Sequence, residues 1–306
     1  MKIRSCVLGL MIAIAAACGD GKPTGPTPVP DPGPVVTNAP PVIGKFTVQS
    51  TRANAPANFA DVLEDVPISV EVSDPEPSSN ELKFNWSAAV GTFSGTGRSV
   101  TWKAPANTIT PVDVVINLEV VETYMSQGKN VDNVVKAPPT NVRLHNSSKE
   151  VGDMAVQFLL DFSTSVLPTN VVMRNFEPDC YGTRDEIGDV NKNRSDFNII
   201  DYRVDAAVTT VRFLGTCAFR NKPGDACARV PVYWKSTARR DLYDSSGALA
   251  LRTGQQTEAS GFDQLAAKYY PTQKRWWLCD SQFDGTSTSL VGSSSRGLLP
   301  LRGMVP

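Results

Sequence analysis

Few residues of this chain have the chemistry of a catalytic centre. The 306 residues include one histidine, His145, and imidazole is a common general base near neutral pH. No carboxylate pattern flanks His145, so we interpret it as a polar contact at an interface. Asp201 and Asp205 would act as bases only in a desolvated pocket, and we expect both to be surface carboxylates. The sequence has no glycine-rich phosphate loop, GxSxG motif or HExxH motif, which favours a protein that is not an enzyme and needs no cofactor.

Four of the six cysteines lie in the second half of the chain: Cys180, Cys217, Cys227 and Cys279. An even number of cysteines in an oxidising compartment predicts disulfides, here two, and four cysteines allow three pairings. We favour Cys217 with Cys227, because they flank the turn sequence NKPGD and would face each other across a hairpin. The remaining pair would be Cys180 with Cys279. A zinc site is the alternative, but the sequence has no CxxC pair, so we expect no metal.

The N-terminus is the reason to expect an oxidising compartment. Residues 1–17 combine Lys2 and Arg4 with a short apolar run and three final alanines, which is typical of a signal peptide and too short to span a bilayer. A cysteine directly after such a site, here Cys18, resembles the lipobox of bacterial lipoproteins. The resemblance implies that Cys18 carries the lipid, including palmitate, and anchors the protein in the cell envelope. Gly19 is similar to the outer-membrane sorting residue of such proteins; the alternative is an ordinary secretory signal.

Composition predicts an extended tether followed by two folded domains. Residues 18–41 are rich in proline and glycine, which favours a semi-extended chain. The chain as a whole is 41% hydrophobic and 20% charged, values typical of globular domains, and its length favours two of them. A net charge of -1 argues against a nucleic-acid partner. No later segment is apolar enough to span a membrane, so the lipid would provide the membrane contact.

Residues 42–147 follow the period of two that is typical of strands. Apolar residues alternate with polar ones from Val66 to Val72, from Leu82 to Trp86 and from Val112 to Val120, which predicts an antiparallel two-sheet β-sandwich. The segments VSDPEPSSNELKFNWS and VGTFSGTGRSVTWKAP resemble PKD-like and other bacterial Ig-like domains of surface proteins. The resemblance implies a spacer or adhesive module. We expect Trp86 and Trp102 to fill the core.

Two further features of this region leave alternatives open. Asp74, Glu76 and Glu81 could bind calcium through hard oxygen ligands, although a solvated acidic turn is the interpretation we favour. The segment from Met125 to Ser147 begins with polar residues, so we expect a loop followed by a closing strand.

Residues 148–283 predict an α+β domain that contains the disulfides. From Glu150 onward, apolar residues recur with helical spacing up to Phe162. A second helix would begin with a capping box at Thr183 and Glu186, and alternating strands follow. Helices before a curved sheet, with the final pair GFDQLAAKYY and KRWWLCDSQF, resemble the NTF2-like (SnoaL-like, cystatin-related) domains, which implies helices packed on a cone of sheet. Residues 284–306 are expected to be a disordered tail with an apolar patch at Leu298, Leu299 and Leu301.

These observations favour a lipid-anchored, non-catalytic binding protein of the cell envelope. The sandwich would act as a spacer or adhesive module, and the C-terminal domain would bind a small ligand or an envelope partner. An exported enzyme with an NTF2-like pocket and a carbohydrate-binding surface protein with a glycan partner remain as alternatives. The enzyme alternative requires an acid such as Asp201 or Asp205 on the concave side of the cone.

Overall fold

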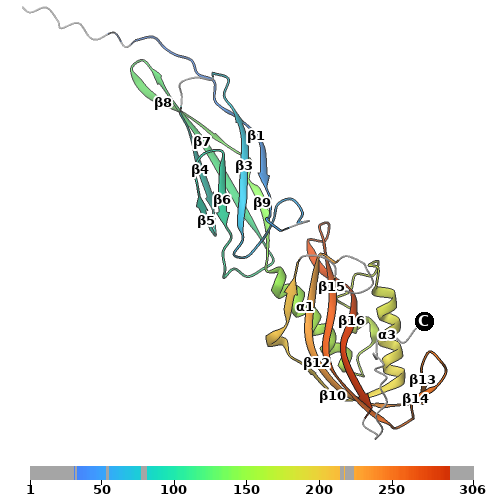
Figure 1. Cartoon of the computed structure of the whole chain (residues 1–306). Helices are drawn as coiled ribbons and strands as arrows, with labels where there is room; N and C mark the ends of the chain where they lie inside the picture. Colours follow the sequence, from blue (N-terminus) through green and yellow to red (C-terminus); the bar gives the residue numbers. More distant parts are fainter. Residues whose placement is uncertain are drawn as a thin grey trace, which may run out of the picture.

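The structure is a computed structural model that describes residues 31, 33–52, 55–76, 81–213, 217 and 224–289. It is mostly β, with several antiparallel sheets and few helices. Two bodies lie end to end (Figure 1). The N-terminal sandwich contains strands β1 to β9, and the C-terminal half-barrel contains the elements from α1 to β16. Among the described residues, no helix combines the length and the apolar character needed to cross a membrane.

Two sheets face each other in the N-terminal sandwich. The first sheet has the order β1-β3-β6-β5 and consists of β1 (Val42–Val48), β3 (Asp65–Ser73), β5 (Thr92–Ser94) and β6 (Ser99–Lys103). The second has the order β2-β9-β7-β4, with β8 beside β7. It consists of β2 (Phe59–Asp61), β4 (Glu81–Ala88), β7 (Val112–Ser126), β8 (Lys129–Lys136) and β9 (Thr140–His145).

The alternating residues of both sheets form the sandwich core. Ile68 of β3 and Ile116 of β7 belong to one buried cluster, as the period of two predicts. Trp102 is fully buried, and its Nε1 donates a hydrogen bond to the carbonyl oxygen of Val90. Trp86 is half-buried and packs against the same cluster. The expectation that both tryptophans fill the core is therefore confirmed.

The polar loop expected from Met125 is instead a β-hairpin. Strand β7 continues to Ser126, and β8 pairs with it from Lys129 onward. The turn consists of Gln127 and Gly128, both with positive φ, at 51° and 74°, the combination that matches the twist of a two-residue hairpin. The sequence signal is weak because glutamine replaces the usual asparagine or aspartate.

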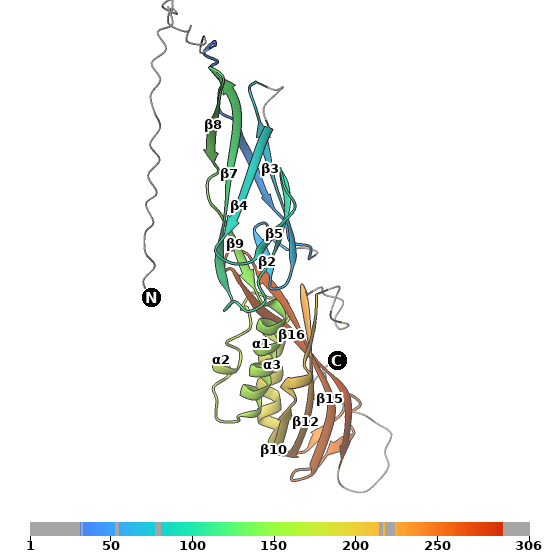
Figure 2. The same cartoon turned by 90° about the vertical axis from the view of Figure 1, so that its left-hand side faces the viewer.

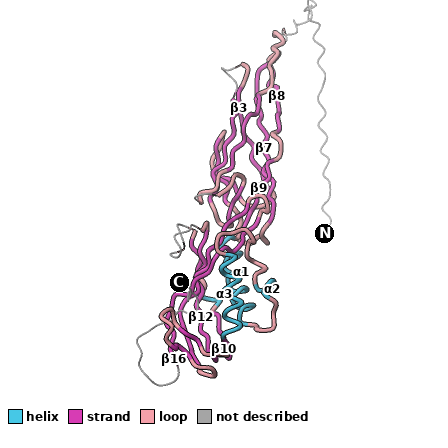
Figure 3. The backbone as a smooth tube through the Cα atoms, turned by 90° about the vertical axis from the view of Figure 1, so that its right-hand side faces the viewer, coloured by secondary structure: helices cyan, strands magenta, loops and turns pink. Residues whose placement is uncertain are grey.

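The C-terminal half-barrel is one curled antiparallel sheet with helices on one face (Figures 2 and 3). The sheet order is β10-β12-β15-β16, with β11 beside β12. The helical elements are α1 (Ser147–Ser163), α2 (Thr169–Val172), α3 (Thr183–Asp196) and the 3-10 helix η1 (Ala206–Val208). The strands of this sheet are β10 (Phe197–Val204), β11 (Thr210–Arg212), β12 (Ala226–Ala238), β15 (Gln256–Tyr270) and β16 (Arg275–Ser289). Strands β13 (Leu242–Tyr243) and β14 (Leu249–Leu251) pair with each other in a separate two-stranded sheet.

Helix α1 buries the apolar stripe that its sequence predicts. Val151, Ala155 and Phe158 are fully buried, and the helix contacts β11, β12 and β16. The side chain of Asn146 caps its start by accepting a hydrogen bond from the backbone N–H of Lys149. The helix therefore begins at Ser147, slightly before the periodic residues.

Two expectations for this body are wrong. Thr183 and Glu186 do not form a capping box, because Thr183 Oγ1 donates to the carbonyl oxygen of Glu177 and Glu186 accepts from Ser281 Oγ. Both side chains are buried, so contacts with the rest of the fold replace the local cap. Strand β16 extends to Ser289, so residues 284–289 belong to the sheet rather than to the tail.

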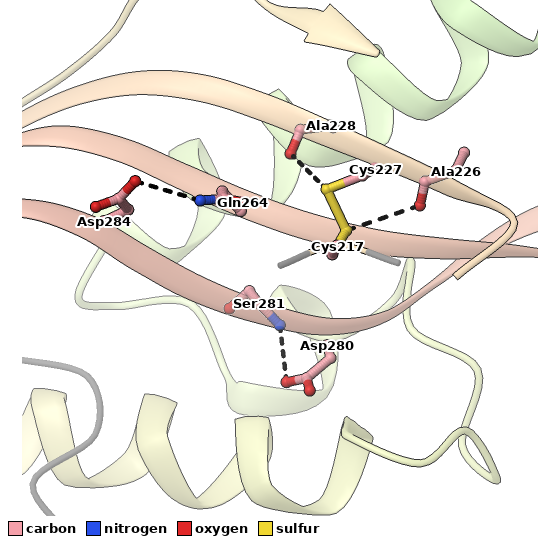
Figure 4. The surroundings of a disulfide bond; sticks show 8 residues. All are labelled: Cys217, Ala226, Cys227, Ala228, Gln264, Asp280, Ser281 and Asp284. Carbon is pink, nitrogen blue, oxygen red and sulfur yellow. Dashed lines mark hydrogen bonds between the residues drawn. A yellow bond between two sulfur atoms is a disulfide. The ribbon is translucent and has the colours of Figure 1, made fainter. Parts of the chain in front are cut away.

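Both expected disulfides are present. Cys180 pairs with Cys279, and Cys217 pairs with Cys227, which is the pairing that the NKPGD turn favours. Figure 4 shows the Cys217–Cys227 bridge, with Cys227 on β12. These bonds indicate an oxidising, extracytoplasmic location. Cys18, the segment 1–17 that we expect to be a signal peptide, and residues 290–306 lie outside the described residues.

Candidate functional site

A cavity lies between the helices and the sheet of the half-barrel. Residues of α1, α3, β10, β12 and β15 line it, and its volume is about 70 Å³. We call it the helix–sheet cavity. Its walls are mainly apolar and aromatic: Phe162, Phe197, Ile199, Tyr202 and Trp234.

Strand alternation brings two polar groups to this apolar cavity. Ser236 follows Trp234 by two positions on β12, and both are buried, with 1% and 8% exposure. Asp263 of β15 lies two positions before the buried Leu265 and is 2% exposed. Among the described residues that line the cavity, Asp263 is the only carboxylate. The site therefore combines a buried acid and a buried hydroxyl with aromatic walls.

Ser236, like Arg194 through its Nε atom, lines this cavity with a polar atom that the described fold leaves unsatisfied. Within the described part of the chain, its Oγ atom has no hydrogen-bond partner. Buried hydroxyls almost always have a partner in the protein or in ordered water, and leaving one without a partner costs about 1–3 kcal/mol. The hydroxyl of Ser236 is therefore free to form a hydrogen bond with water or with another group that enters the cavity.

Two arginines line the helix–sheet cavity, and both donate hydrogen bonds to backbone carbonyl oxygens. Arg194 of α3 donates hydrogen bonds to the carbonyl oxygens of Leu167 and Thr164, and burial lowers its pKa from the usual value. Arg239 donates through Nε to the carbonyl oxygen of Phe197, at 2.9 Å. Because these guanidinium groups are engaged with the backbone, their positions in the lining are fixed by the fold.

The carboxylates considered as bases lie outside this cavity. Asp201 of β10 pairs with Arg203 on the same strand, and Asp205 caps the 3-10 helix by accepting a hydrogen bond from the backbone N–H of Ala207. Neither is among the residues that line the cavity. The residues that sequence reasoning missed are Ser236 and Asp263, although the alternation with Leu265 places Asp263 on the inner face.

The single histidine lies between the two bodies. His145 ends β9 and is fully buried. Its Nδ1 lies 2.8 Å from Glu150 Oε2, its Nε2 lies 3.2 Å from the hydroxyl oxygen of Tyr269, and its ring stacks on Phe59 at 4.9 Å. Both ring nitrogens thus have partners inside the protein, as expected for a polar contact at an interface.

Arg52 of the sandwich also takes part in the contact between the two bodies around His145. The guanidinium carbon of Arg52 lies 4.4 Å from the ring centroid of Phe59 and 4.9 Å from that of Trp276 on β16. Its Nε lies 3.4 Å from Asp61 Oδ2. We call this group of contacts the joint, and it consists of Arg52, Phe59, Asp61, His145, Ser147, Tyr269 and Trp276.

The acidic turn considered for calcium is held by backbone groups. Asp74 Oδ1 accepts a hydrogen bond from the N–H of Glu76, and Glu76 Oε2 accepts one from the N–H of Ala39. Across the described ranges, no three His, Cys, Asp or Glu side chains are grouped to hold a metal ion.

Comparisons of the chain with protein-family models, with curated proteins and with solved structures find no match.

Proposed function

We propose that this chain is a lipid-anchored protein of the bacterial cell envelope, at the outer membrane, and that it acts as a non-catalytic binding module. In this proposal the lipid is attached to Cys18, and the sandwich is an Ig-like (PKD-like) spacer. The C-terminal half-barrel is an NTF2-like cone that binds an envelope partner or a small ligand. The disulfides support export, because such bonds persist in oxidising compartments.

This proposal is supported by the place where the N-terminal segment joins the sandwich, relative to the half-barrel. The backbone of Val36 donates a hydrogen bond to Ser126 Oγ, and the N–H of Gln127 donates to the carbonyl oxygen of Pro34. The chain thus enters the fold at the β7–β8 hairpin, at the end of the sandwich away from the half-barrel (Figure 1). A protein anchored through its N-terminal segment would therefore hold the half-barrel away from the membrane.

The lipid anchor is tested on protein purified from the envelope of the producing cells. Mass spectrometry of the N-terminal peptide should show lipid mass on Cys18. A Cys18→Ala variant should leave the membrane fraction. Cys6→Ala is the matched control, since Cys6 lies within the signal peptide, and it should remain membrane-bound. An unmodified N-terminus in the native protein would refute the anchor.

The binding role is tested by photo-crosslinking in intact cells. A photoreactive amino acid at the exposed Tyr243 of the half-barrel should give adducts with an envelope component. The matched position is Val115 on the sandwich, which is also exposed and should give none if the sandwich is a spacer. Adducts from Val115 alone would contradict the assignment of the half-barrel as the binder.

A further inference from the structure

The end of the β7–β8 hairpin exposes a group of apolar side chains. Met125 of β7 is 60% exposed, and Val131 of β8 is exposed as well. The entering chain adds Val35, which is 70% exposed, and Val36. Val36 lies beside the hairpin, because its backbone N–H donates a hydrogen bond to Ser126 Oγ at 3.2 Å. We call residues 34–36 and 124–131 the hairpin tip.

The hairpin tip contains no acidic residue. Its one charged side chain is the exposed Lys129. The nearest acidic residues in the sequence, Asp31 and Asp132, lie outside the tip, and both accept hydrogen bonds within the protein. Apolar side chains together with Tyr124 and a lysine are typical of residues at a membrane interface, where aromatic rings lie among the headgroups and lysine extends its ammonium group towards the water.

The position of the hairpin tip determines which surface it meets. It lies at the end of the sandwich away from the half-barrel (Figures 1 and 2), where the chain enters the fold. Cys18 precedes Pro34 by 16 positions, which a fully extended chain spans in about 55 Å. A lipid on Cys18 would therefore keep the tip within this distance of the bilayer, so the inference rests on the anchor in the proposed function.

This tether makes a small apolar contact sufficient. A few apolar side chains alone would bind a membrane only weakly, as a single acyl chain does. When the protein is already held by its N-terminal end, docking of the tip becomes an intramolecular step at a high effective concentration. Stable attachment commonly combines two such weak signals.

We propose that the hairpin tip docks on the lipid surface that holds the N-terminus. Val35, Met125 and Val131 lie at the boundary between headgroups and acyl chains, and Lys129 lies beside the lipid phosphates. The tip and the N-terminal lipid are then two separate contacts with one bilayer. They hold the sandwich upright, with the half-barrel pointing away from the membrane.

The experiment replaces the native lipid by an artificial tether. The chain from Gly19 onward carries an N-terminal histidine tag and is held on vesicles of phosphatidylethanolamine and phosphatidylglycerol with a nickel-chelating lipid. A polarity-sensitive fluorescent amino acid at the exposed Asn130 of the tip should shift its emission to the blue. Lipids with spin labels on their acyl chains should quench about half of this emission, since interfacial side chains lie about 5–10 Å deep.

The matched reporter position is Val115, which is also exposed. It precedes Met125 by ten positions on β7, about 34 Å along the strand, and its emission should neither shift nor be quenched. Unchanged emission from Asn130 on the vesicles would overturn the proposal. Because this tether does not use Cys18, an unmodified N-terminus would refute the anchor without deciding the affinity of the tip for lipid.

Serine variants test which side chains make the contact. With the reporter at Asn130, M125S/V131S should lose the blue shift and the quenching while the tag still holds the chain on the vesicles. Both substituted positions are exposed, so the fold should be retained. V115S is the matched control and should behave like the unaltered chain. A shift that persists in M125S/V131S would contradict the proposal, and a shift without vesicles that grows with protein concentration would assign the tip to a second copy instead.

Discussion

At the scale of single residues, Gly91 is the described glycine at which an added Cβ atom would make the closest contact. Its φ is +81°, and a Cβ atom there would lie 2.3 Å from Nε1 of the buried Trp102. Gly91→Ala should lower the free energy of unfolding by about 3 kcal/mol or more, because a left-handed backbone and an overpacked core each cost about 1–3 kcal/mol. Urea denaturation measures this loss.

Gly97 provides the matched control for this substitution. Its φ is +87°, but a Cβ atom there would meet nothing within 4 Å. Gly97→Ala should therefore show only the backbone cost, about 1–2 kcal/mol. Equal losses for both variants would mean that the contact with Trp102 contributes nothing.

Asp61 gives a prediction for the dependence of stability on pH. Burial raises the pKa of Asp61, although hydrogen bonds from Ser147 and the charge of Arg52 act in the opposite direction. A carboxyl group whose pKa is raised by folding stabilises the fold at pH values below its unfolded pKa, and this contribution is lost as the pH rises through the folded pKa. The neutral Asp61→Asn variant lacks this dependence. The stability of the unaltered chain relative to Asp61→Asn should therefore fall as the pH rises from below the usual aspartate pKa of about 4 towards neutral pH.

Urea unfolding of both proteins at the two ends of this pH range measures the difference. Because the amide side chain of the Asp61→Asn variant cannot titrate, the comparison cancels the other ionisable groups that the two chains share. A relative stability that increases with pH would show that the ion pair with Arg52 outweighs the burial of Asp61.

The roles of His145, Asp263 and Ser236 differ in how far they can be predicted from the sequence. The absence of a flanking carboxylate pattern was the basis for predicting that His145 makes an interface contact, and its burial against Phe59 agrees. Asp263 was missed although strand alternation places it inside, because a lone acid within GFDQLAAKYY looks like a surface residue. The sequence does not predict that the hydroxyl of Ser236 lacks a hydrogen-bond partner, because the available partners depend on the whole fold.

At the scale of elements, the two disulfides should differ in their contributions to stability. The Cys180–Cys279 bond links α3's leading loop to β16 across a sequence separation of 99 residues, whereas Cys217–Cys227 spans 10. In the chain-entropy model these loops correspond to about 4.7 and about 2.7 kcal/mol. Replacing both cysteines of the long loop by serine should therefore cost about 2 kcal/mol more than the same change in the short loop.

Denaturant unfolding of the two double-serine variants measures this difference, and each variant is the matched control for the other. An equal or reversed order would show that native contacts around the bonds, rather than restriction of the unfolded chain, determine their contributions. The comparison needs no assumption about the geometry of either bond.

Elements with a strong periodic pattern were predictable, and those that depend on distant partners were not. The apolar stripe from Val151 to Phe162 was enough to predict α1, and strict alternation predicted β3 and β7. The β7–β8 hairpin was missed because Gln127 is an unusual residue at a position with positive φ. The capping box failed because Glu186 reaches Ser281, almost a hundred residues away, and no local pattern reports such a partner.

At the scale of the whole molecule, the joint decides whether the two bodies behave as one rod. A flexible link would let the half-barrel reorient freely on the sandwich, whereas a spacer is effective only if it is stiff. The structure favours stiffness, since Trp276 donates a hydrogen bond to Ser147 Oγ and the N–H of Ser147 donates to Asp61. Through Ser147, these contacts connect β16, the start of α1 and β2.

Arg52 is the residue through which this stiffness can be tested. Its guanidinium group is stacked among rings from both bodies and lies beside the half-buried Asp61. Arg52→Ala removes these ring contacts and leaves the carboxylate of Asp61 without its cation, which should weaken the contact between the two bodies. Small-angle X-ray scattering should then show a broader distribution of distances between the bodies, and proteases should cleave near His145. Arg98→Ala, at an exposed arginine of the same sandwich, should change neither result. If Arg52→Ala scatters like the unaltered chain, the remaining contacts of His145 and Trp276 are sufficient to hold the two bodies as one rod.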